Sequence, residues 1–312
     1  MAETNIYCYS RLQPRGGLGN KLFVWAYGLV FSDRNNCPHY ISNWSVIHFG
    51  PLLRGQKSLR LYFGSFNNMP FWRKRALKTA LSKAKKVDLL ANDIALKPEY
   101  IKEPTLFRFY KVSDEWHTAY DDIKPYRSLI IDNLDSVIKK RVYKKLKTHK
   151  IPFIGVHIRK GDFKPLKENA SLETSSIAQQ TPNQYFVDTI NQLRAYLGKD
   201  VSVTIFSDGR PSELKELLAL KNVAMVREDL DIVHMLLLSQ SEIIILSEGS
   251  TFGGWSAFLG DGLIIRNSAM FRNTIRPDRD NKKVYEGVLP AHEEEYPLLL
   301  HQSLKSLLAS YE

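Results

Sequence analysis

The sequence has few cysteines, no low-complexity tract and no long apolar run. Cys8 and Cys37 are the only cysteines among 312 residues, too few for a disulfide framework or a zinc site. The apolar runs are shorter than the roughly 20 residues that a membrane-spanning helix needs. Because the first residues carry no basic segment ahead of an apolar core, we expect no secretory signal. These absences favour a reducing, cytoplasmic location.

The chain is strongly basic. Its formal net charge is +11, with 44 lysines and arginines against 33 aspartates and glutamates. Such a charge favours anionic partners, namely phosphates, nucleotides, anionic lipids or nucleic acids, without choosing among them. The hydrophobic fraction of 44% is that of a globular protein, and the length suffices for two domains.

A strand, a glycine turn and a helix follow one another near the start. Residues 5–9 predict a strand, residues 15–20 (Arg-Gly-Gly-Leu-Gly-Asn) a turn, and residues 22–30 an apolar helix. Such a turn can point backbone N–H groups at an anion. Its spacing matches neither the dinucleotide fingerprint nor the phosphate loop, so a plain tight turn stays the alternative.

Two basic helices are predicted later in the first half. Residues 71–87 predict an amphipathic helix with a basic face, and residues 128–149 predict a second helix that ends in a basic run. The basic face over 73–87 is either a solvated surface or a peripheral contact with the inner face of a membrane.

The second half alternates apolar strands with helices. This alternation predicts a parallel, doubly wound sheet with right-handed crossovers. We expect an N-terminal domain over 1–150, a Rossmann-like domain over 151–290, and a C-terminal helix over 291–312 that packs back on the N-terminal domain. The predicted strands lie at 151–158, 201–206, 223–226, 243–246 and 263–265, and the predicted helices at 182–197, 211–220, 230–239 and 251–259.

Polar residues gather where these strands end. The segments 159–162, 207–209, 227–228 and 247–251 all leave carboxyl ends of parallel strands, where open α/β sheets bind ligands. We therefore expect the four segments to line one crevice.

Several of these residues suit a phosphate ligand. Arg159 could hold phosphate oxygens with its planar fork, and Ser250 with Thr251 begins a helix. Asp208 could accept hydrogen bonds from a base or ribose. The alternatives are an Arg159–Asp162 ion pair, ordinary helix capping and a turn aspartate.

Metal and hydrolase chemistry are not indicated. Asp229 and Asp231 resemble the Asp-x-Asp metal motif, but they fall in the first turn of an apolar helix, where acids are common anyway. The sequence shows neither metal-ligand spacing nor a Gly-x-Ser-x-Gly elbow. We expect no metal and no cofactor.

Four motifs in order carry a family resemblance. They are Arg15-Gly-Gly-Leu-Gly-Asn-Lys-Leu-Phe23, His157-Ile-Arg-Lys-Gly-Asp162, Phe206-Ser-Asp208 and Ser250-Thr-Phe-Gly-Gly-Trp-Ser-Ala257. Together they resemble the bacterial α-1,2-fucosyltransferases and the wider superfamily of α-1,2-, α-1,6- and protein O-fucosyltransferases. The resemblance spans residues 15 to about 260, and the His-x-Arg-x-x-Asp segment is its most specific part.

The resemblance implies a fold and a ligand. The fold would be GT-B, with two Rossmann-like domains facing each other across a cleft, the first on the acceptor side and the second binding GDP-fucose without a metal ion. Arg159 would bind the diphosphate and stabilise departing GDP, His157 would lie beside the donor, and Asp208 would lie near the guanosine. The phosphates would be wrapped by Ser250, Thr251 and Phe252, and the facing loop would contain Gly17, Gly19 and Asn20.

The sequence departs from the family pattern at three places. Lys160 replaces the second arginine of the usual pair, and Lys21 replaces the usual glutamine. Gly253-Gly254-Trp255 replaces Ser-Trp-Trp, which leaves the acceptor and the linkage open.

The expected reaction is inverting transfer of L-fucose from GDP-β-L-fucose to a sugar hydroxyl, α-1,2 to a galactoside in surface polysaccharide or oligosaccharide synthesis. Asp162, Glu168 and Glu248 are candidates for the general base, with orientation of Arg159 as the alternative role of Asp162. One rival is a GT-B enzyme that uses another nucleotide sugar. The other is a non-enzymatic basic protein that binds nucleic acid or membrane, although no nucleic-acid-binding motif supports nucleic acid.

Overall fold

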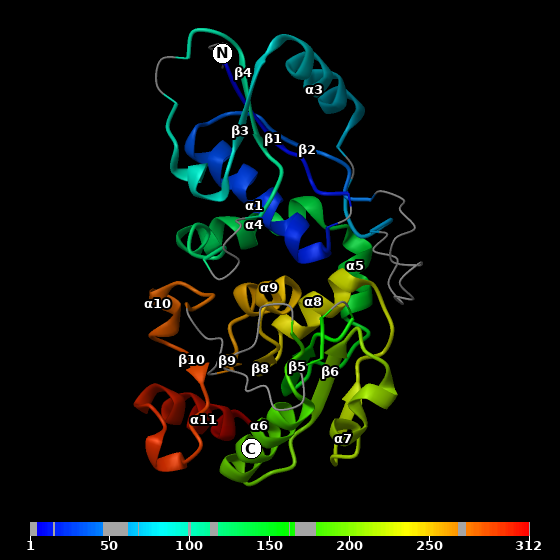
Figure 1. Ribbon diagram of the computed structural model, residues 1–312, viewed down its shortest axis with the longest axis vertical. Coiled ribbons are helices and arrows are strands. Elements are labelled where there is room, and N and C mark those ends of the chain that lie inside the picture. The colour runs from blue at the N-terminus through cyan, green and yellow to red at the C-terminus, as the bar shows by residue number, and fades with distance from the viewer. Residues whose placement is uncertain are drawn as a thin grey trace. The chain divides into compact units, whose positions relative to one another are not determined.

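The computed structural model describes residues 5–14, 16–45, 62–67, 69–98, 101–112, 118–161, 163–165, 179–267 and 273–311. The chain forms two compact units, Met1–Tyr143 and Lys144–Glu312 (Figure 1). The division falls inside helix α5 (Lys140–Leu146), a few residues before the predicted boundary at 150.

The first unit contains a four-stranded parallel sheet in the order β2-β1-β4-β3. The sequence predicted only one of its strands. The four are β1 (Ile6–Ser10), β2 (His39–Ile41), β3 (Lys85–Leu89) and β4 (Thr105–Phe109).

The predicted helix over 71–87 is too long. Helix α3 (Phe71–Lys83) ends at Ala84, whose backbone is extended at φ −82° and ψ 145°. Residues 85–89 then pair in parallel with β4 as an edge strand. Pairing with a neighbouring strand overrides the helical pattern here, because the helical stripe of apolar residues stops at Ala84.

Helices cover both faces of this sheet. Helix α1 (Leu18–Arg34) lies on the face of Cys8 and Ser10: the Cys8 thiol donates to the Gly28 carbonyl at 3.4 Å, and the Ser10 hydroxyl to the Val24 carbonyl at 2.8 Å. Helix α3 packs on the opposite face, where its alanines meet Leu106 and partly buried tyrosines. The residues of that small cluster are Tyr7, Tyr9, Ala80, Leu81, Ala84 and Leu106.

The single helix predicted over 128–149 is in fact two. Helix α4 (Arg127–Val137), preceded by the 3-10 turn η2 (Lys124–Tyr126), ends at Ile138, which is extended and forms an antiparallel bridge with Phe66. Helix α5 starts two residues later. The break satisfies backbone groups of the neighbouring segment, since the Lys139 N–H donates to the Ser65 carbonyl at 3.0 Å. A short 3-10 turn, η1 (Ala91–Ala95), completes the unit.

The second unit contains a six-stranded parallel sheet in the order β10-β9-β8-β5-β6-β7. The parallel, doubly wound sheet predicted from the alternation is confirmed. The order reverses between β5 and β8, which makes this pair the topological switch point, where such sheets bind ligands. The strands are β5 (Ile154–Ile158), β6 (Val203–Ser207), β7 (Val223–Met225), β8 (Ile243–Leu246), β9 (Leu263–Arg266) and β10 (Glu286–Val288), and only the last was not predicted.

Two groups of helices cover this sheet (Figure 1). Helices α6 (Asn183–Leu197), α7 (Lys215–Leu218) and α11 (Leu298–Tyr311) pack on the face of Ile154, Val156 and Ile158. The opposite face carries α8 (Asp231–Ser239) and α9 (Thr251–Leu259), with His157 stacked on Phe252 of α9. The short elements are η4 (Pro211–Leu214), which with α7 replaces the longer predicted helix, α10 (Asp278–Asn281) and η5 (Glu293–Glu295).

The C-terminal helix belongs to the second unit. Leu300 and Leu304 of α11 are fully buried in the same apolar core as α6 and the central strands. Tyr296, just before the helix, stacks on Tyr196 of α6 with ring centroids 5.7 Å apart. The predicted packing of this helix on the N-terminal domain is therefore wrong, because its apolar stripe completes the core of the second unit.

Candidate functional site at the switch point

Three of the four predicted loops contact one another at the carboxyl ends of β5, β6 and β8. The Ser247 N–H donates to the His157 carbonyl at 2.9 Å, and the Ser247 hydroxyl accepts from the Arg159 N–H at 3.0 Å. On the other side of β5, Asp208 accepts from the Lys160 N–H at 2.8 Å. The first turn after β5 is thus tied to the loops after β6 and β8.

The fourth loop lies farther along the sheet. The Arg227 side chain donates to the Thr148 hydroxyl at 3.0 Å, and its carbonyl contacts the His234 ring at 3.0 Å. These contacts place residues 227–228 beyond β7, two strands from the switch point. They do not show this segment joining the other three.

Arg159 and Asp208 form a half-buried ion pair. The Arg159 guanidinium donates to Asp208 Oδ2, and it also lies over the Phe163 ring, 5.6 Å from the ring centroid. The side chains are 21% and 33% exposed, so solvent can still reach both. The expected alternative partner, Asp162, lies outside the described residues, as does Glu168.

Gly161 makes this arrangement possible. A Cβ atom at Gly161 would lie only 2.2 Å from Asp208 Oδ2. Any side chain there would push the carboxylate away from the Lys160 N–H and from Arg159. The glycine in the His-x-Arg-x-Gly-Asp segment therefore permits the close approach of the loop after β6 to the turn after β5.

His157 is buried and neutral. Its side chain is 5% exposed, and the ring stacks on Phe252 with centroids 5.5 Å apart and an interplanar angle of 23°. Burial, and secondarily the charge of Arg159, lowers the pKa of His157 to about 3. His157 is therefore not an imidazolium acid at neutral pH.

The unusual Gly253 has a packing reason. A Cβ atom at Gly253 would lie 2.8 Å from His157 Nδ1 and 3.1 Å from a methyl group of Leu246. The serine that the family pattern has at this position does not fit the present position of the His157 ring. The glycine at position 253 is therefore required by the position of the His157 imidazole.

Helix α9 starts just after β8, on the other side of the switch point from Asp208. Gly249 adopts a left-handed backbone at φ 72°, and Ser250 is the extended residue before the helix, making no side-chain cap hydrogen bond. The first N–H groups of a helix have no partner within it, and the helix dipole adds positive potential there. The sequence left open that Ser250 is an ordinary helix cap, but its side chain makes no capping hydrogen bond.

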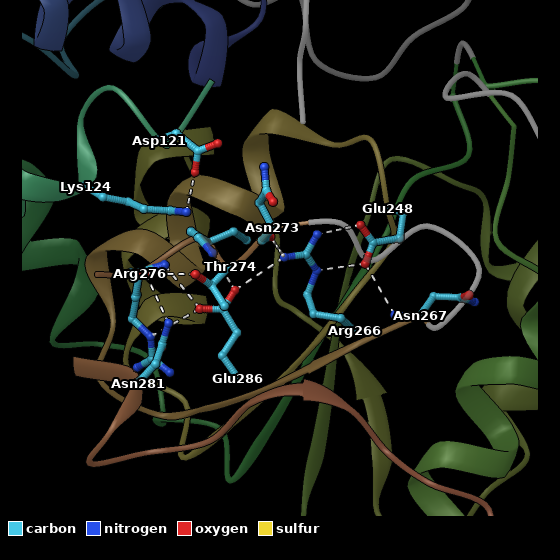
Figure 2. Close-up of polar contacts among 11 residues, drawn as sticks. Asp121, Lys124, Glu248, Arg266, Asn267, Asn273, Thr274, Arg276, Asn281 and Glu286 are labelled. Atoms are coloured by element: carbon cyan, nitrogen blue, oxygen red, sulfur yellow. Dashed lines mark hydrogen bonds and ion pairs between the residues drawn. The ribbon is translucent and has the colours of Figure 1, made fainter. Parts of the chain in front are cut away.

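Glu248 is held by a buried charge network (Figure 2). Its two carboxylate oxygens accept from Nε and Nη2 of Arg266, each at 2.7 Å, and Arg266 also donates to Glu286 at 3.3 Å. The exposed fractions of the three residues are 3%, 6% and 8%. A carboxylate engaged in this way is unsuited to take a proton from an acceptor, so Glu248 is a poor candidate for the base.

The network anchors the segment next to the helix start. Glu286 of β10 also accepts from the backbone N–H groups of Ile275 and Arg276, the latter at 3.1 Å. It therefore ties the turn after β8, the end of β9 and residues 275–276 together. Sequence reasoning missed Arg266 and Glu286, although a charge at the end of the apolar strand Leu263–Arg266 was a signal that could have indicated a buried pair.

The glycine turn of the first unit is shorter than predicted. Gly17 is the N-cap of α1, and Gly19 and Asn20 lie in its first turn rather than in a loop. A Cβ atom at Gly17 would meet nothing within 4 Å, so this position faces open space. The glycine motif therefore forms the N-terminus of α1, which is the positive end of the helix dipole.

Lys21 is a structural residue. Its ammonium group donates to the Trp44 carbonyl at 2.7 Å and lies 5.1 Å from the centroid of the Tyr62 ring, with the side chain 1% exposed. Burial lowers the pKa of Lys21 to about 8. The lysine that replaces the family's glutamine therefore ties α1 to residues 44 and 62.

Asp229 of the Asp-x-Asp segment is engaged with Lys145 and His149. Asp229 accepts from Lys145 at 2.6 Å, from the Leu230 N–H at 2.7 Å and contacts His149 at 3.1 Å. Burial alone would raise the pKa of Asp229, but the hydrogen bonds from Lys145 and His149 outweigh it and lower the pKa to about 2. Within the described ranges, no group of three or more His, Cys, Asp or Glu could hold a metal ion.

In the part of the chain that the structure describes, no helix is both long and apolar enough to cross a membrane.

Two parallel α/β units, the second with a topological switch point, form an architecture of the GT-B type. Among solved structures, POFUT1 without ligand aligns with a TM-score of 0.50 and 13% identity over 84% of this chain and 97% of that chain. POFUT1 in complex with GDP aligns with a TM-score of 0.50 and 13% identity over 84% of this chain and 98% of that chain. NodZ alpha-1,6-fucosyltransferase soaked with GDP-fucose aligns with a TM-score of 0.48 and 12% identity over 84% of this chain and 94% of that chain.

The family follows from the sequence comparison. The model of glycosyl transferase family 11 matches residues 76–284, which is 209 of 312 residues, and the chain belongs to that family. This membership confirms the resemblance at the level of the family. No curated protein sequence matches the chain at a significant level.

Proposed function

We propose that the protein is an inverting fucosyltransferase that moves L-fucose from GDP-β-L-fucose to a sugar hydroxyl. The observation that carries the proposal is the Arg159 guanidinium, held beside Asp208 next to the switch point. Membership of family 11 supports it, and so does the likeness in fold to POFUT1, which has been solved in complex with GDP.

Arg159 has the geometry to serve two partners. A guanidinium carries five N–H donors, so one part can keep Asp208 while the others bind diphosphate oxygens. Asp208, which we place near the guanosine, would thereby also fix the orientation of Arg159. The start of α9 at Ser250 and Thr251 would contribute backbone donors from the β8 side, and Phe252 would keep His157 in place beside the donor.

The proposed reaction separates charge. The bond between fucose C1 and the β-phosphate oxygen breaks, and its electron pair leaves with GDP. The acceptor oxygen bonds to C1 from the opposite face, and its proton passes to a carboxylate, for which Asp162 is our candidate. Arg159 and the helix start supply preorganised positive potential for the departing GDP, and one such interaction is typically worth ~3 kcal/mol, or about a hundredfold in rate.

For the acceptor we propose a galactoside, with an α-1,2 linkage. The reaction would then belong to the assembly of surface polysaccharide or oligosaccharide by a cytoplasmic enzyme that needs no metal ion. Gly253 and Gly254 stand where the family has larger residues, and at Gly253 the His157 ring and Leu246 fill the space that a side chain would take.

Release of GDP from GDP-fucose, measured with a panel of galactosides and with product analysis by NMR, tests this proposal. We expect turnover without added metal and an α-1,2 product. Thermal unfolding with GDP, UDP and CDP tests the donor, and only GDP should raise the melting temperature. Stabilisation by UDP or CDP instead would favour the rival reading, a GT-B enzyme with another nucleotide sugar.

A further inference from the structure

Helix α3 exposes its two largest apolar side chains. Phe71 is 82% exposed and Trp72 is 68% exposed, and they occupy the first two positions of the helix. Isolated exposed apolar residues are common on protein surfaces, but two adjacent aromatic residues at this exposure are not needed to fold the unit.

The helix packs on its own sheet without them. Its contact with β1 and β4 uses the small residues Ala80 and Ala84, which meet Leu106 on the sheet face. Both alanines are buried, at 7% and 9% exposure. The stripe that attaches α3 to the first unit is therefore separate from the aromatic pair.

Cations surround the aromatic pair. The helix Phe71–Lys83 contains five lysines and arginines and no carboxylate: Arg73, Lys74, Arg75, Lys78 and Lys83. Helical spacing puts Phe71, Lys74, Arg75 and Lys78 on one face, since residues three, four and seven apart are neighbours. The Arg73 guanidinium lies 5.6 Å from the centroid of the Trp72 ring.

The basic surface continues into the next strand. Lys85 and Lys86 at the start of the edge strand β3 are exposed, and Glu103 Oε1 lies 3.7 Å from the Lys85 ammonium group. Lys86 pairs with Leu106 in the sheet and so lies on the face that α3 covers, where it extends the basic surface of the helix, whereas Lys85 points to the opposite face.

We propose that this surface, Phe71 to Lys86, docks on the face of an anionic phospholipid bilayer. Phe71 and Trp72 would insert at the level of the headgroups, where aromatic rings are favoured, and the cations would face lipid phosphates. A membrane is favoured over a nucleic acid because the apolar and basic side chains share one helix face, which matches a planar interface. The inference stands whether or not the transferred sugar is fucose.

Cosedimentation with vesicles tests the docking. The wild-type protein should bind vesicles of equal parts phosphatidylglycerol and phosphatidylcholine, and bind pure phosphatidylcholine far more weakly. Because each cation near an anionic surface contributes roughly fivefold in affinity, Lys74→Glu/Lys78→Glu should lower binding more than tenfold. Phe71→Ala/Trp72→Ala should lower it by a similar factor.

A charge-matched control separates the surface from the overall charge. Lys140→Glu/Lys147→Glu makes the same change at two exposed lysines near α5 and should keep binding within about threefold of wild type. An equal loss in both charge variants would overturn the proposal, since binding would then follow net charge alone. Wild-type binding in the aromatic variant would also overturn it.

Tryptophan fluorescence gives a second readout. Trp25, Trp44 and Trp255 are buried at 1%, 2% and 0% exposure, so Trp72 should report the vesicle surface. In a Trp116→Phe background, which removes the tryptophan outside the described residues, anionic vesicles should shift the emission to shorter wavelength. Trp72→Phe should abolish that shift while keeping vesicle binding, and a shift that survives Trp72→Phe would contradict insertion.

Two further measurements test whether α3 binds RNA or belongs to the acceptor site instead of docking on a membrane. Salt-sensitive binding of a single-stranded RNA that is lost in the α3 variants, with no vesicle binding, would replace the membrane with a nucleic acid. Turnover of GDP-fucose with a soluble galactoside should be unchanged in the α3 variants. A loss of that turnover with an unchanged melting temperature would place α3 in the acceptor site and overturn the docking proposal.

Discussion

The two units use charge in opposite ways. In the second unit, Glu248, Arg266 and Glu286 are buried and paired, and they hold the segment beside the helix start. In the first unit, α3 has five lysines and arginines on its surface and no carboxylate. Paired charges inside a protein fix geometry, whereas a one-signed exposed face attracts a charged partner. Charge therefore fixes the geometry beside the site in the second unit, and in the first it forms the surface for which we propose docking.

The largest expected effect concerns the buried network. Glu248→Ala leaves the Arg266 guanidinium buried with half of its partners, which should cost about 3–5 kcal/mol in the free energy of unfolding. Urea denaturation measures it. Asp200→Ala, which breaks the exposed pair of Asp200 with Lys221, is the matched control and should show no measurable change. If the two variants are equally stable, the network does not hold the site.

Loss of Arg159 should act on catalysis more than on folding. Arg159→Ala removes the proposed charge on departing GDP and should lower kcat about a hundredfold, or ~3 kcal/mol, while the melting temperature changes little because the pair with Asp208 is half-buried. Arg159→Lys should retain part of the rate, since it keeps the charge but loses the fork. Arg279→Ala, at an exposed arginine, serves as control; wild-type turnover by Arg159→Ala would contradict the mechanism.

The packing of Gly253 against His157 can be tested by placing at position 253 the serine that the family pattern has there. Gly253→Ser should destabilise the protein by about 1–3 kcal/mol, because its Cβ atom forces the imidazole to move. Gly17→Ala, where a Cβ atom meets nothing within 4 Å, is the control. Gly253→Ser/His157→Ala should lose less stability than the two single variants add up to, and strict additivity would show that the two sites do not interact.

One histidine in each unit, His39 and His157, has a lowered pKa, which predicts a shared pH dependence. Burial first, then Arg73, lowers the pKa of His39 to about 3, and the pKa of His157 is also about 3. Since the unfolded chain takes up these protons below about pH 6.5, stability should fall by roughly 1.4 kcal/mol per pH unit for each histidine between that pH and 3. Unfolding free energies measured from pH 7 to pH 5 should show a shallower slope in His39→Gln and in His157→Gln. An unchanged slope in either variant would show that its histidine is protonated in the folded protein.

The two units also differed in how far the sequence could predict them. In the second unit, β5 and β8 are buried along their whole length, so they appear as apolar runs bounded by turns. In the first unit, β3 is a half-exposed edge strand that starts Lys-Lys, and β2 has three residues. Helical periodicity therefore extended over β3, because edge strands receive their stability from pairing rather than from their own composition.

By itself the sequence determined the parallel second sheet, the order of its elements and the gathering of Arg159, Asp208 and the loop after β8 at one sheet edge. Those features follow from local periodicity and from the rule that parallel strands end on the same side. Only the tertiary structure decided that Asp208 pairs with Arg159, that Glu248 is occupied by Arg266, and that α11 completes the second core. The reason is physical: these contacts join residues about 18 to 150 positions apart, and packing chooses such partners, whereas local pattern does not.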